Sequence, residues 1–502
     1  MIVKQGSAPN GAETSVQQKR KARISMRRTI PITAALLALA VAAPVASAAD
    51  YPLPDKPGTP QPKPSGKGKT FKVCPKLTKK SKKAGCKYTV VQQAVDAAKA
   101  GDTVKIADGT YGEGVIVAGA NKRYLKIVGN VKSPQKVMFD MKKIPKKVKY
   151  KSKVKGGNAY NTQIQNAVAI NSANEVTLNG LGARNFKGNG FFVVNNTGYT
   201  FDHLWAQNVG TYGIYAFNTI GGTMKNSEAS YNNDAGFYIG QTPPQDKPIR
   251  TIVSNLKSWG NVLGWSGTNM KYVTIKDSDF YNNGAGIVPN ALRSEKFAPP
   301  EFNTIINNRV FLNNFNYRKG KIPFLVQSSS TDGVPYPIGV GILLFGSQTT
   351  TVENNQIFGN YLLGFGALQQ LLLSIDDQPV DKADPNGPKV KDMVEWYTLR
   401  GNKVINNKFG NGGANPNGRS IGYDGNGTDN CISGNDLDSE PTVPANQGTF
   451  VPCPFSGANV FDSAAQGEAV GWVASSDLEA NWMKKPQAPV AGVTPLEHGT
   501  LR

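Results

Sequence analysis

Short apolar strands recur along most of the chain, and each begins at a glycine or at another small residue. They are the segments AVAI, GFFV, GIYA, GFYI, GWSG, GIVP, GILL and GFGA, which start at positions 167, 190, 213, 236, 264, 286, 341 and 364. Most of the steps between these starts are 22 or 23 residues, and the longer steps of 28 and 55 fit turns that carry loop insertions. A fixed period without intervening helices predicts a repeat architecture.

Two further strand segments follow each of these first strands. The second segments are TLNG, TFDH, TMKN, TIVSN, TIKD, TIINN, TVENN and TLRGN, and third segments include EASYNN, SDFYNN, RVFLNN and QIFGN. Three short strands per period can bury their apolar residues only by winding into a coil, whose rungs stack about 4.8 Å apart. The paired asparagines, as in NNDAGFYIG at 232–240 and NNGAGIVPN at 282–290, are expected to turn the corners and to stack as a ladder of amides.

Side-chain alternation within a strand separates a core column from an outward column. The expected core column is Phe191, Ile214, Phe237, Trp265, Ile287, Ile342 and Phe365, and the outward column is Ala169, Phe192, Tyr215, Tyr238, Ser266, Val288 and Leu343. Three consecutive outward positions, Phe192, Tyr215 and Tyr238, are aromatic and predict a stacking platform for the flat faces of sugar rings. The alternative is that a loop or the C-terminal tail covers these rings, because an exposed aromatic row is otherwise a liability.

One amphipathic helix precedes the repeats, in the stretch TVVQQAVDAAKAGDTVKIADGTY. Thr89 and Gln92 have the spacing of a capping box. Val91, Ala94, Val95 and Ala98 fall on one helical face, and the helix is expected to end at Gly101, before a strand at 103–107. Such a helix could close the open end of a stack of strands.

The stretch VVQQAVDAAKAGDTVKIADGTYGEGVIV, followed by KIVG and by the GI…NN rungs, resembles the pectin lyase-like right-handed parallel β-helix superfamily. It is most similar to the right-handed β-helix repeat proteins that include carbohydrate-binding and sugar-hydrolase repeats. The resemblance spans 88–437 and implies an all-β, right-handed parallel β-helix with three short strands per 22–23-residue rung and an N-terminal helix cap. A left-handed hexapeptide helix would need a period in multiples of six, and a propeller needs blades of about 40–50 residues.

The first 48 residues have the layout of a secretory signal peptide. A positive start at Met26–Arg28 precedes an apolar run, Ala34–Val45, and a small-residue cleavage site, Ala46–Ala48; Met26 is a candidate for the true start. A membrane anchor is the competing interpretation, but the run is shorter than the ~20 residues that span a bilayer. We therefore expect a secreted protein. We expect its exported chain to consist of a basic linker with a disulfide loop at 49–87, the coil at 88–437, and a non-repeating tail at 438–502 that packs on the coil.

The four cysteines form one close pair near each end of the exported chain. Disulfides Cys74–Cys86 and Cys431–Cys453 are the simplest of the three connectivities in an oxidising compartment. A zinc site is disfavoured, because the pairs lie far apart in sequence and the chain has 2 His.

Positive charge is concentrated near the N-terminus of the exported chain. Residues 56–155 hold 26 Lys or Arg against five Asp or Glu, whereas the whole chain has a net charge of +22. This excess predicts a polyanionic partner, such as an acidic polysaccharide or a cell-wall polymer, with nucleic acid a weaker alternative for an exported chain. The other interpretation is a solvated linker. We expect a monomer that is not an integral membrane protein.

Candidate catalytic residues lie beside the aromatic row. Asp234 precedes the Tyr238 strand at a position where the other rungs have no acid, and Arg293 and Lys296 lie in a loop after a neighbouring strand. A carboxylate base and a cation are what elimination or epimerisation of a uronate polymer needs. The expected substrate-binding set is Phe192, Tyr215, Tyr238, Gln241 and Glu295. In the alternative, Asp234 accepts backbone hydrogen bonds at a turn and the loop charges pair with one another.

The catalytic signatures of the superfamily are not matched. The resemblance would imply clustered calcium-binding Asp with an Arg base, or three close Asp with HG and RIK, or a DPHD motif, and the sequence has none of these arrangements. His203 aligns with a column of turn asparagines, although Asp202 beside it keeps a catalytic role open. Asp424, Asn426 and Asp429 offer oxygen ligands that suit calcium, and a Gly-rich turn beside Cys431 is the other interpretation. The sequence therefore predicts no cofactor, and it leaves two hypotheses: a polysaccharide lyase or epimerase, and a non-catalytic wall-binding module.

Overall fold

The computed structural model describes residues 63–143, 150, 152, 154, 165–317, 336–474 and 488–493. All of these belong to one compact unit, Val45–Arg502; the other unit, Met1–Pro44, lies outside the described residues. The predicted signal peptide and the first part of the predicted linker therefore also lie outside them.

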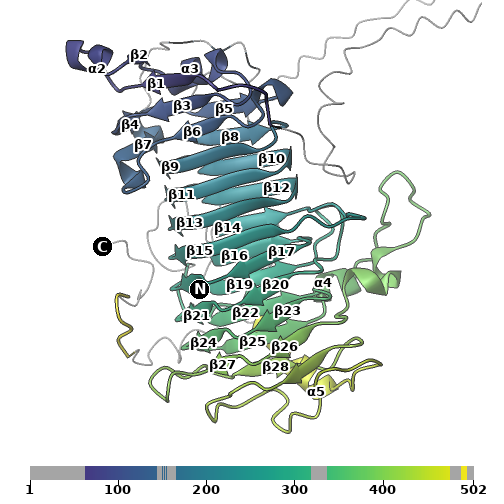
Figure 1. Ribbon diagram of the computed structural model, residues 1–502. Coiled ribbons are helices and arrows are strands. Elements are labelled where there is room, and N and C mark those ends of the chain that lie inside the picture. Colours follow the sequence, from purple (N-terminus) through teal and green to yellow (C-terminus); the bar gives the residue numbers. More distant parts are fainter. Residues whose placement is uncertain are drawn as a thin grey trace, which may run out of the picture. The chain divides into compact units, whose positions relative to one another are not determined.

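Strands of the described residues form two sheets in which the paired strands run parallel (Figure 1). The smaller sheet consists of β5 (Val115–Ala118), β8 (Val168–Asn171), β10 (Phe191–Thr197), β12 (Ile214–Ile220), β14 (Ala235–Gly240), β16 (Leu263–Thr268), β19 (Ala285–Asn290), β22 (Val340–Phe345), β25 (Leu363–Leu368) and β28 (Ile421–Tyr423). Each of its strands pairs with the equivalent strand of the next rung, which is the stacking that the sequence period predicts.

The larger sheet bends around a corner and supplies the other two faces of the coil. Its strands are β1 (Thr70–Val73), β2 (Cys86–Tyr88), β3 (Thr103–Ile106), β4 (Gly109–Tyr111), β6 (Lys126–Val128), β7 (Val137–Asp140), β9 (Val176–Arg184), β11 (Tyr199–Gln207), β13 (Gly222–Ser230), β15 (Thr251–Trp259), β17 (Val273–Lys276), β18 (Asp279–Tyr281), β20 (Thr304–Ile306), β21 (Arg309–Phe311), β23 (Thr351–Glu353), β24 (Gln356–Phe358), β26 (Lys403–Ile405), β27 (Lys408–Phe409) and β29 (Cys431–Ser433). The long strands β9, β11, β13 and β15 each run along two faces of the coil. From β17 onward, two short strands replace each long one, as β17 and β18 both pair with β15. Together with the strand of the smaller sheet, this gives three short strands per rung, as predicted.

Helices are few and short. They are α2 (Lys79–Lys83), α3 (Val91–Ala97), α4 (Leu371–Ser374) and α5 (Ser463–Ala474), with 3-10 turns η1 (Ala120–Lys122), η2 (Pro134–Lys136), η3 (Met141–Lys143), η4 (Val390–Asp392) and η5 (Val394–Trp396). Among the described residues, none of these helices is both long and apolar enough to cross a membrane.

The corner that divides the larger sheet is turned by a single residue in the left-handed conformation on each rung. The corner residues are Gly180, His203, Asn226, Asn255, Asp277, Asn307, Asn354, Asn406 and Gly434, with φ between +49° and +70°. Glycine and asparagine tolerate this conformation at the lowest steric cost. His203 therefore occupies a turn position, and its Nδ1 lies 2.6 Å from Asp202 Oδ1.

Inside the coil, the predicted core column is fully buried from Phe191 to Phe365. The asparagine ladder lies beside it and joins consecutive rungs through side-chain amides: Asn232, Asn261, Asn283, Asn313, Asn360 and Asn417. The recurring glycine fits against this ladder. A Cβ on Gly213 would lie 2.6 Å from the Gly236 carbonyl oxygen and 2.8 Å from Asn232 Nδ2. The repeated phrase in the sequence is thus a ladder asparagine plus the glycine that makes room for it.

The N-terminal cap differs in two respects from the prediction. The coil begins at Thr70, not at 88, because β1 pairs in register with β3. Helix α3 is present, but Thr89 does not cap it: the Glu113 carboxylate accepts the backbone N–H groups of Val91 at 2.9 Å and Gln92 at 3.1 Å. Gln92 is instead buried, and its side chain hydrogen-bonds Ile116. A glutamate 22 residues downstream supplies the cap that a local pattern suggested.

Two disulfides join Cys74 to Cys86 and Cys431 to Cys453, as predicted. At the other end of the coil, α5 packs on β28. The Trp472 ring lies against Gly422, where an added Cβ would be 3.0 Å from it, and the Arg419 guanidinium lies over the same ring. Segment 488–493 packs through Val490 and Val493 against Phe311 and Phe358.

Candidate functional site

The predicted aromatic column exists on the outward face of the smaller sheet. Strand pairing places Phe192 beside Tyr215 and Tyr215 beside Tyr238, on three consecutive rungs. Their neighbours Phe191 and Phe237 are in the core, so alternation directs the three rings away from it. The column continues to Ala169 on one side and to Ser266 on the other.

The geometry of these rings corrects the expected platform of three open faces. Phe192 and Tyr215 stack on each other, with centroids 4.6 Å apart and an interplanar angle of 20°. Tyr238 packs edge-on against Tyr215 at 4.8 Å, and Tyr212 contacts both tyrosines. Rings that stack along the coil axis contact each other through their faces, so their edges are left toward solvent. Phe192 is the end of the stack, and its next neighbour in the column is the small side chain of Ala169.

Tyr238 is covered, with an exposed fraction of 1%, so this ring follows the alternative interpretation, in which a loop covers the row, and not the open platform. Its hydroxyl donates a hydrogen bond to the Glu295 carboxylate, in the loop that follows β19. Burial, and then the nearby Glu295 carboxylate, raise the pKa of Tyr238 well above its usual value. Asn269 Nδ2 holds the same loop by donating to the Leu292 carbonyl at 2.7 Å and to the Glu295 carbonyl at 2.8 Å. Gln241 Oε1 accepts the backbone N–H of Lys296 at 3.0 Å.

The loop therefore forms a wall across the outward face. From Tyr238 onward the column is buried, through Ser266, Val288 and Leu343. On the rungs of β10 and β12, by contrast, Phe192 and Tyr215 remain partly exposed, together with Val194 and Phe217 in the parallel column. We call the surface of these four residues the open strip.

The three predicted catalytic residues have different surroundings. Asp234 is 3% exposed at the start of β14, where its backbone N–H donates to Thr211 and its carbonyl accepts from Leu263. Lys296 is exposed at the wall. Arg293 forms a half-buried ion pair, at 2.9 Å, with Asp376 in the segment between α4 and η4.

Arg293 also lines a pocket separate from the open strip. This pocket has a volume of about 480 Å³ and is lined further by Asp377, Gln378, Pro379, Lys382, Pro385 and Lys389. Asp377 in its rim lies 2.9 Å from both Lys389 and Lys391, and these two hydrogen bonds lower its pKa to about 2. Arg293, Asp377 and Lys389 of this pocket are thus each held in an ion pair, and Arg293 pairs with a residue outside its own loop.

Sequence reasoning missed a row of amides that borders the open strip. Asn218 Nδ2 donates to Asn195 Oδ1 at 2.8 Å, and Asn195 Nδ2 donates to Asn171 Oδ1 at 3.3 Å. Asn195 within β10 and Asn218 within β12 adopt the left-handed conformation and bend their strands. The signal was an asparagine five residues after the column-initiating glycine in GFFVVN and GIYAFN, at 195 and 218. Amides in this position offer donors and acceptors to a ligand lying along the aromatic edges.

A second aromatic stack, also missed, lies on the third face of the coil. Trp259, Tyr281, Phe311 and Phe358 stack on consecutive rungs with interplanar angles of 7–11°. Each stands two residues before a ladder asparagine, and this spacing was the overlooked signal. The last two rings are buried, and Val490 and Val493 pack against this cluster, whereas Trp259 and Tyr281 are partly exposed.

Among the described residues, no group of three or more His, Cys, Asp or Glu side chains could hold a metal ion. The run that suggested calcium is a set of turns. Asp424 is buried and accepts Asn426 N–H at 2.9 Å and Gln466 Nε2 at 3.2 Å. Burial raises the pKa of Asp424. Asp429 accepts the backbone N–H of Gly457 at 2.8 Å.

Comparison with known proteins gave matches to solved structures. The sequence matches no protein-family model and no curated protein sequence. Among solved structures, the chain is similar to the A-module of mannuronan C-5 epimerase AlgE4 from Azotobacter vinelandii, at 17% identity and a TM-score of 0.41, over 69% of this chain and 90% of that one. It is also similar to the periplasmic alginate epimerase AlgG (11%, TM-score 0.39, 67% and 77% covered) and to pectate lyase Pel9A (13%, TM-score 0.39, 78% and 82% covered).

These similarities concern the coil and carry nothing about activity. The fold follows from the chain itself, whose rungs pair in parallel and in register from β1 to β29. Connections between parallel strands of one sheet are right-handed in nearly all proteins. The chain is a right-handed parallel β-helix protein, the fold class that the sequence resemblance predicted.

Proposed function

We propose that this protein is exported and binds an acidic polysaccharide along the open strip of Phe192, Val194, Tyr215 and Phe217. The observation that carries the proposal is the contrast along one outward face. The chain buries this column from Tyr238 onward, yet leaves stacked aromatic rings partly exposed on β10 and β12. Exposed apolar surface rimmed by polar groups marks interaction sites.

The surroundings of the open strip fit a sugar chain. Aromatic edges and the free end of the stack at Phe192 provide apolar contact for C–H groups. The amide row Asn171–Asn195–Asn218 runs along one border and provides hydrogen bonds to hydroxyl or carboxylate oxygens. Lys187 before β10 and Lys296 on the wall are exposed, and they supply positive charge for a uronate.

The binding test uses short oligosaccharides with the mature chain. Calorimetric titration compares oligogalacturonate and oligomannuronate with neutral oligosaccharides of the same length. Phe192→Ala and Tyr215→Ala should each weaken binding of an acidic oligomer by roughly fivefold, the equivalent of about 1 kcal/mol of ring contact. Phe461→Ala, at a ring 50% exposed elsewhere, is the matched control. Unchanged binding in both strip variants, with loss in Trp259→Ala, would move the site to the third face.

A second candidate is processing of the same polymer by elimination or epimerisation. The pairing of the Tyr238 hydroxyl with Glu295, beside the exposed Lys296, favours it, because a proton donor, a carboxylate and a cation meet at the wall. Asp234 remains the proposed base, and Arg293, which pairs with Asp376 in a separate pocket, is the second proposed cation. Unsaturated-product absorbance and the epimer ratio of uronate polymers are the readouts, and Asp234→Asn should abolish them. Binding without turnover on any of these polymers would leave the non-catalytic module.

A further inference from the structure

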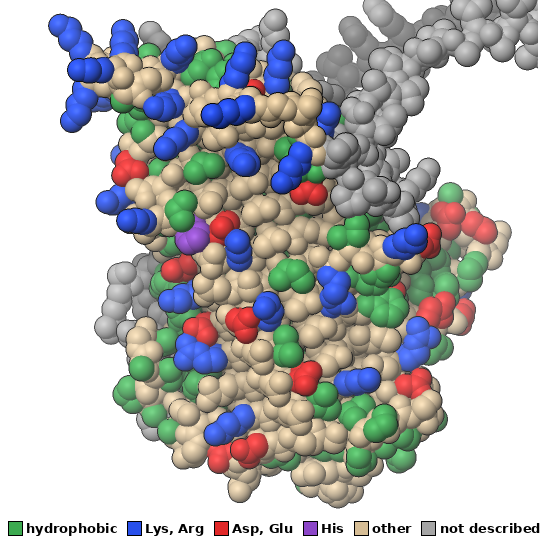
Figure 2. Space-filling view, viewed as in Figure 1, with side chains coloured by type: hydrophobic (Ala, Val, Ile, Leu, Met, Phe, Trp, Pro, Cys, Tyr) green, Lys and Arg blue, Asp and Glu red, His purple; other side chains and the backbone are tan. Residues whose placement is uncertain are grey.

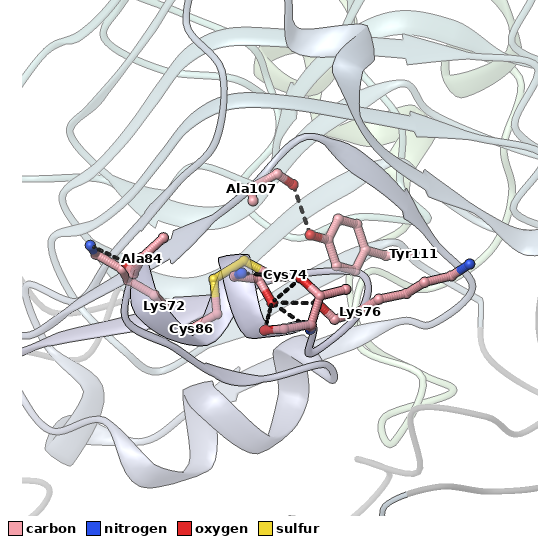
Figure 3. Close-up of a disulfide and its surroundings, with 9 residues drawn as sticks. Lys72, Cys74, Lys76, Ala84, Cys86, Ala107 and Tyr111 are labelled. Atoms are coloured by element: carbon pink, nitrogen blue, oxygen red, sulfur yellow. Dashed lines mark hydrogen bonds between the residues drawn. A yellow bond between two sulfur atoms is a disulfide. The ribbon is translucent and has the colours of Figure 1, made fainter.

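A compact, lysine-bearing loop projects at the N-terminal end of the coil. It runs from Lys72 in β1 to Lys87 in β2, and α2 lies within it. We call it the lysine knuckle. Figure 3 shows the Cys74–Cys86 disulfide that closes it, with Lys72 reaching the Ala84 carbonyl and Lys76 pointing away from it.

Helix α2 of the knuckle is held firmly, although the buried residues of this segment, such as Val73, lie outside the helix. Helix α2 has no buried residue. Its start is fixed by a reciprocal capping box, in which Ser81 N–H donates to Thr78 Oγ1 at 3.1 Å and Thr78 N–H donates to Ser81 Oγ at 2.8 Å. Its end is held by the hydrogen bond of Lys72 Nζ to the Ala84 carbonyl at 2.8 Å. A disulfide and a capping box thus keep in place a helix that has nothing to bury.

The charges on the knuckle repel one another. Its seven lysines are exposed: Lys72, Lys76, Lys79, Lys80, Lys82, Lys83 and Lys87. The segment contains no acidic residue, and none of these lysines forms an ion pair with another described residue. Like charges four residues apart on a helix, as at Lys79 and Lys83, destabilise it by about 0.2–0.5 kcal/mol per pair. Because the lysines of the knuckle repel one another, a bound anion would reduce this repulsion and stabilise the loop.

The same end of the coil carries further positive charge. Lys67, Lys69 and Lys99 line a pocket of about 240 Å³ beside β1. The one acid in its lining, Asp102, is occupied by the backbone N–H groups of Lys69 at 2.6 Å and Lys99 at 2.7 Å. Figure 2 shows Lys and Arg side chains gathered over this end, where Figure 1 places α2, β1 and β2.

We propose that the lysine knuckle is a second, independent site that binds linear anionic glycopolymers of the cell surface. The site recognises charge density and not one sugar. Lysine is a compact point charge, whereas the planar arginine fork selects a bidentate carboxylate or phosphate, and the knuckle has no arginine. Several flexible cations on one rigid loop fit a polymer with closely spaced charges. The knuckle would retain the protein on an anionic surface while the open strip engages individual sugars.

The test uses long polygalacturonate and alginate, with dextran as the uncharged polymer, and the mature full chain at about 50–300 mM salt. Replacing Lys79, Lys80 and Lys83 together by Gln should weaken binding of both acidic polymers about tenfold near 0.15 M salt and flatten the salt dependence. The matched control replaces Lys257, Lys403 and Lys408, three exposed lysines on the coil, by Gln. Equal weakening in the control would reduce the effect to net charge and overturn the proposal.

Two further arms separate this proposal from its competitors. Phe192→Ala should leave polymer retention at the knuckle unchanged and affect only short oligosaccharides, so either site can fail without the other. If duplex DNA binds the knuckle more tightly than the glycopolymers at the same salt, the assignment to glycopolymers is wrong. Loss of retention in Cys74→Ser, Cys86→Ser with an unchanged lysine content would support rigid display, and full retention would contradict it.

Discussion

Asn417 donates to one carboxylate from both its backbone and its side chain: its backbone N–H lies 2.8 Å from Glu440 Oε1 and its side-chain Nδ2 lies 2.9 Å from Glu440 Oε2. This contact ends the asparagine ladder, in which each amide donates to the next rung. Within the ladder, one amide oxygen accepts both bonds from the preceding asparagine, as Asn417 Oδ1 does from Asn360. At Glu440 the two bonds reach separate oxygens, so in this geometry an amide nitrogen in place of one oxygen would turn a donor toward a donor.

Replacing Glu440 by Gln should therefore destabilise the last rungs. One N–H of Asn417 loses its acceptor in a buried position, which costs about 1–3 kcal/mol of unfolding free energy. Denaturant unfolding of the mature chain measures this difference. Glu468→Gln, in the exposed pair with Arg419, is the control and should change stability by less than about 0.5 kcal/mol. Equal effects would mean that the ladder needs no terminal acceptor.

Stability should fall as the pH rises from about 4.5 to about 7, because of Glu113. Burial raises the pKa of Glu113 to about 7 from an ordinary value of 4.5, against the opposing hydrogen bonds from Val91 and Gln92. Between these values the folded chain holds a proton that the unfolded chain has released. The stabilisation is complete below the unfolded pKa and is lost through the folded one. Burial raises the pKa of Glu440 similarly, to about 7.

Thermal unfolding from pH 4.5 to 8 measures this effect. Glu113→Gln should reduce the decline, and the double variant with Glu440→Gln should reduce it further. A Tm that rises over this range in the unaltered chain, or the same slope in the double variant, would show that neither group titrates as stated.

Adding one methyl group to the glycine column should be costly. Gly213→Ala places Cβ within 2.6 Å of a backbone oxygen of the next rung and 2.8 Å of a ladder amide. Relief requires the rungs to separate, with an expected loss of about 1–3 kcal/mol or more. Gly467→Ala in α5 meets no atom within 4 Å and should stabilise the helix by up to about 1 kcal/mol. Chemical denaturation of both variants provides the comparison, and similar signs would refute the steric argument.

Tyr238→Phe should loosen the wall loop. The change removes the donor that Glu295 accepts and leaves a carboxylate partly buried, so about 1–3 kcal/mol of stability should be lost. Amide exchange of 291–297 should accelerate, while binding of short acidic oligosaccharides changes less than about twofold, since the ring stays in place. Tyr231→Phe is the control. A large loss of binding would place the hydroxyl in the site itself.

The C-terminal disulfide should stabilise more of the coil than the N-terminal one. Cys431–Cys453 joins the last rung to the tail across a separation of 22 residues. Its removal by paired Ser substitution should cost about 3 kcal/mol, by loop-closure entropy. The Cys74–Cys86 loop holds a helix with no buried residue, so its removal should leave the main transition largely unchanged. Calorimetry of the two paired variants distinguishes them.

The fold could be predicted because the contacts of a coil repeat the period of its sequence. Phe191 packs beside Ile214, and Asn283 bonds to Asn313, at offsets that are visible as spacing in the chain. Even the outward alternation of Phe192, Tyr215 and Tyr238 follows from strand geometry.

The site could not be predicted to the same depth, because loops decide it. Tyr238 is covered by Glu295, 57 residues away, and Arg293 is drawn to Asp376, 83 residues away. Neither partner stands at a multiple of the period. The sequence pattern also does not show what the ring faces contact. Aromatic rings that follow one another at the rung spacing stack on each other, and the outward alternation alone does not reveal this. The Glu113 cap shows the same limit, since a local motif named Thr89 and the coil supplied a more distant acceptor.

The single-residue corners have a consequence for how such a chain can lengthen or shorten. Asn189 and Tyr212 occupy the same place on adjacent turns, as do Phe191 and Ile214. Excising residues 190–212 would join Asn189 to Gly213 and leave each column aligned. Removing a number of residues that does not correspond to a whole rung would shift the columns, so that a polar corner residue would face the interior. The coil is therefore a modular stack, whose length can change only by whole units unless a loop absorbs the remainder.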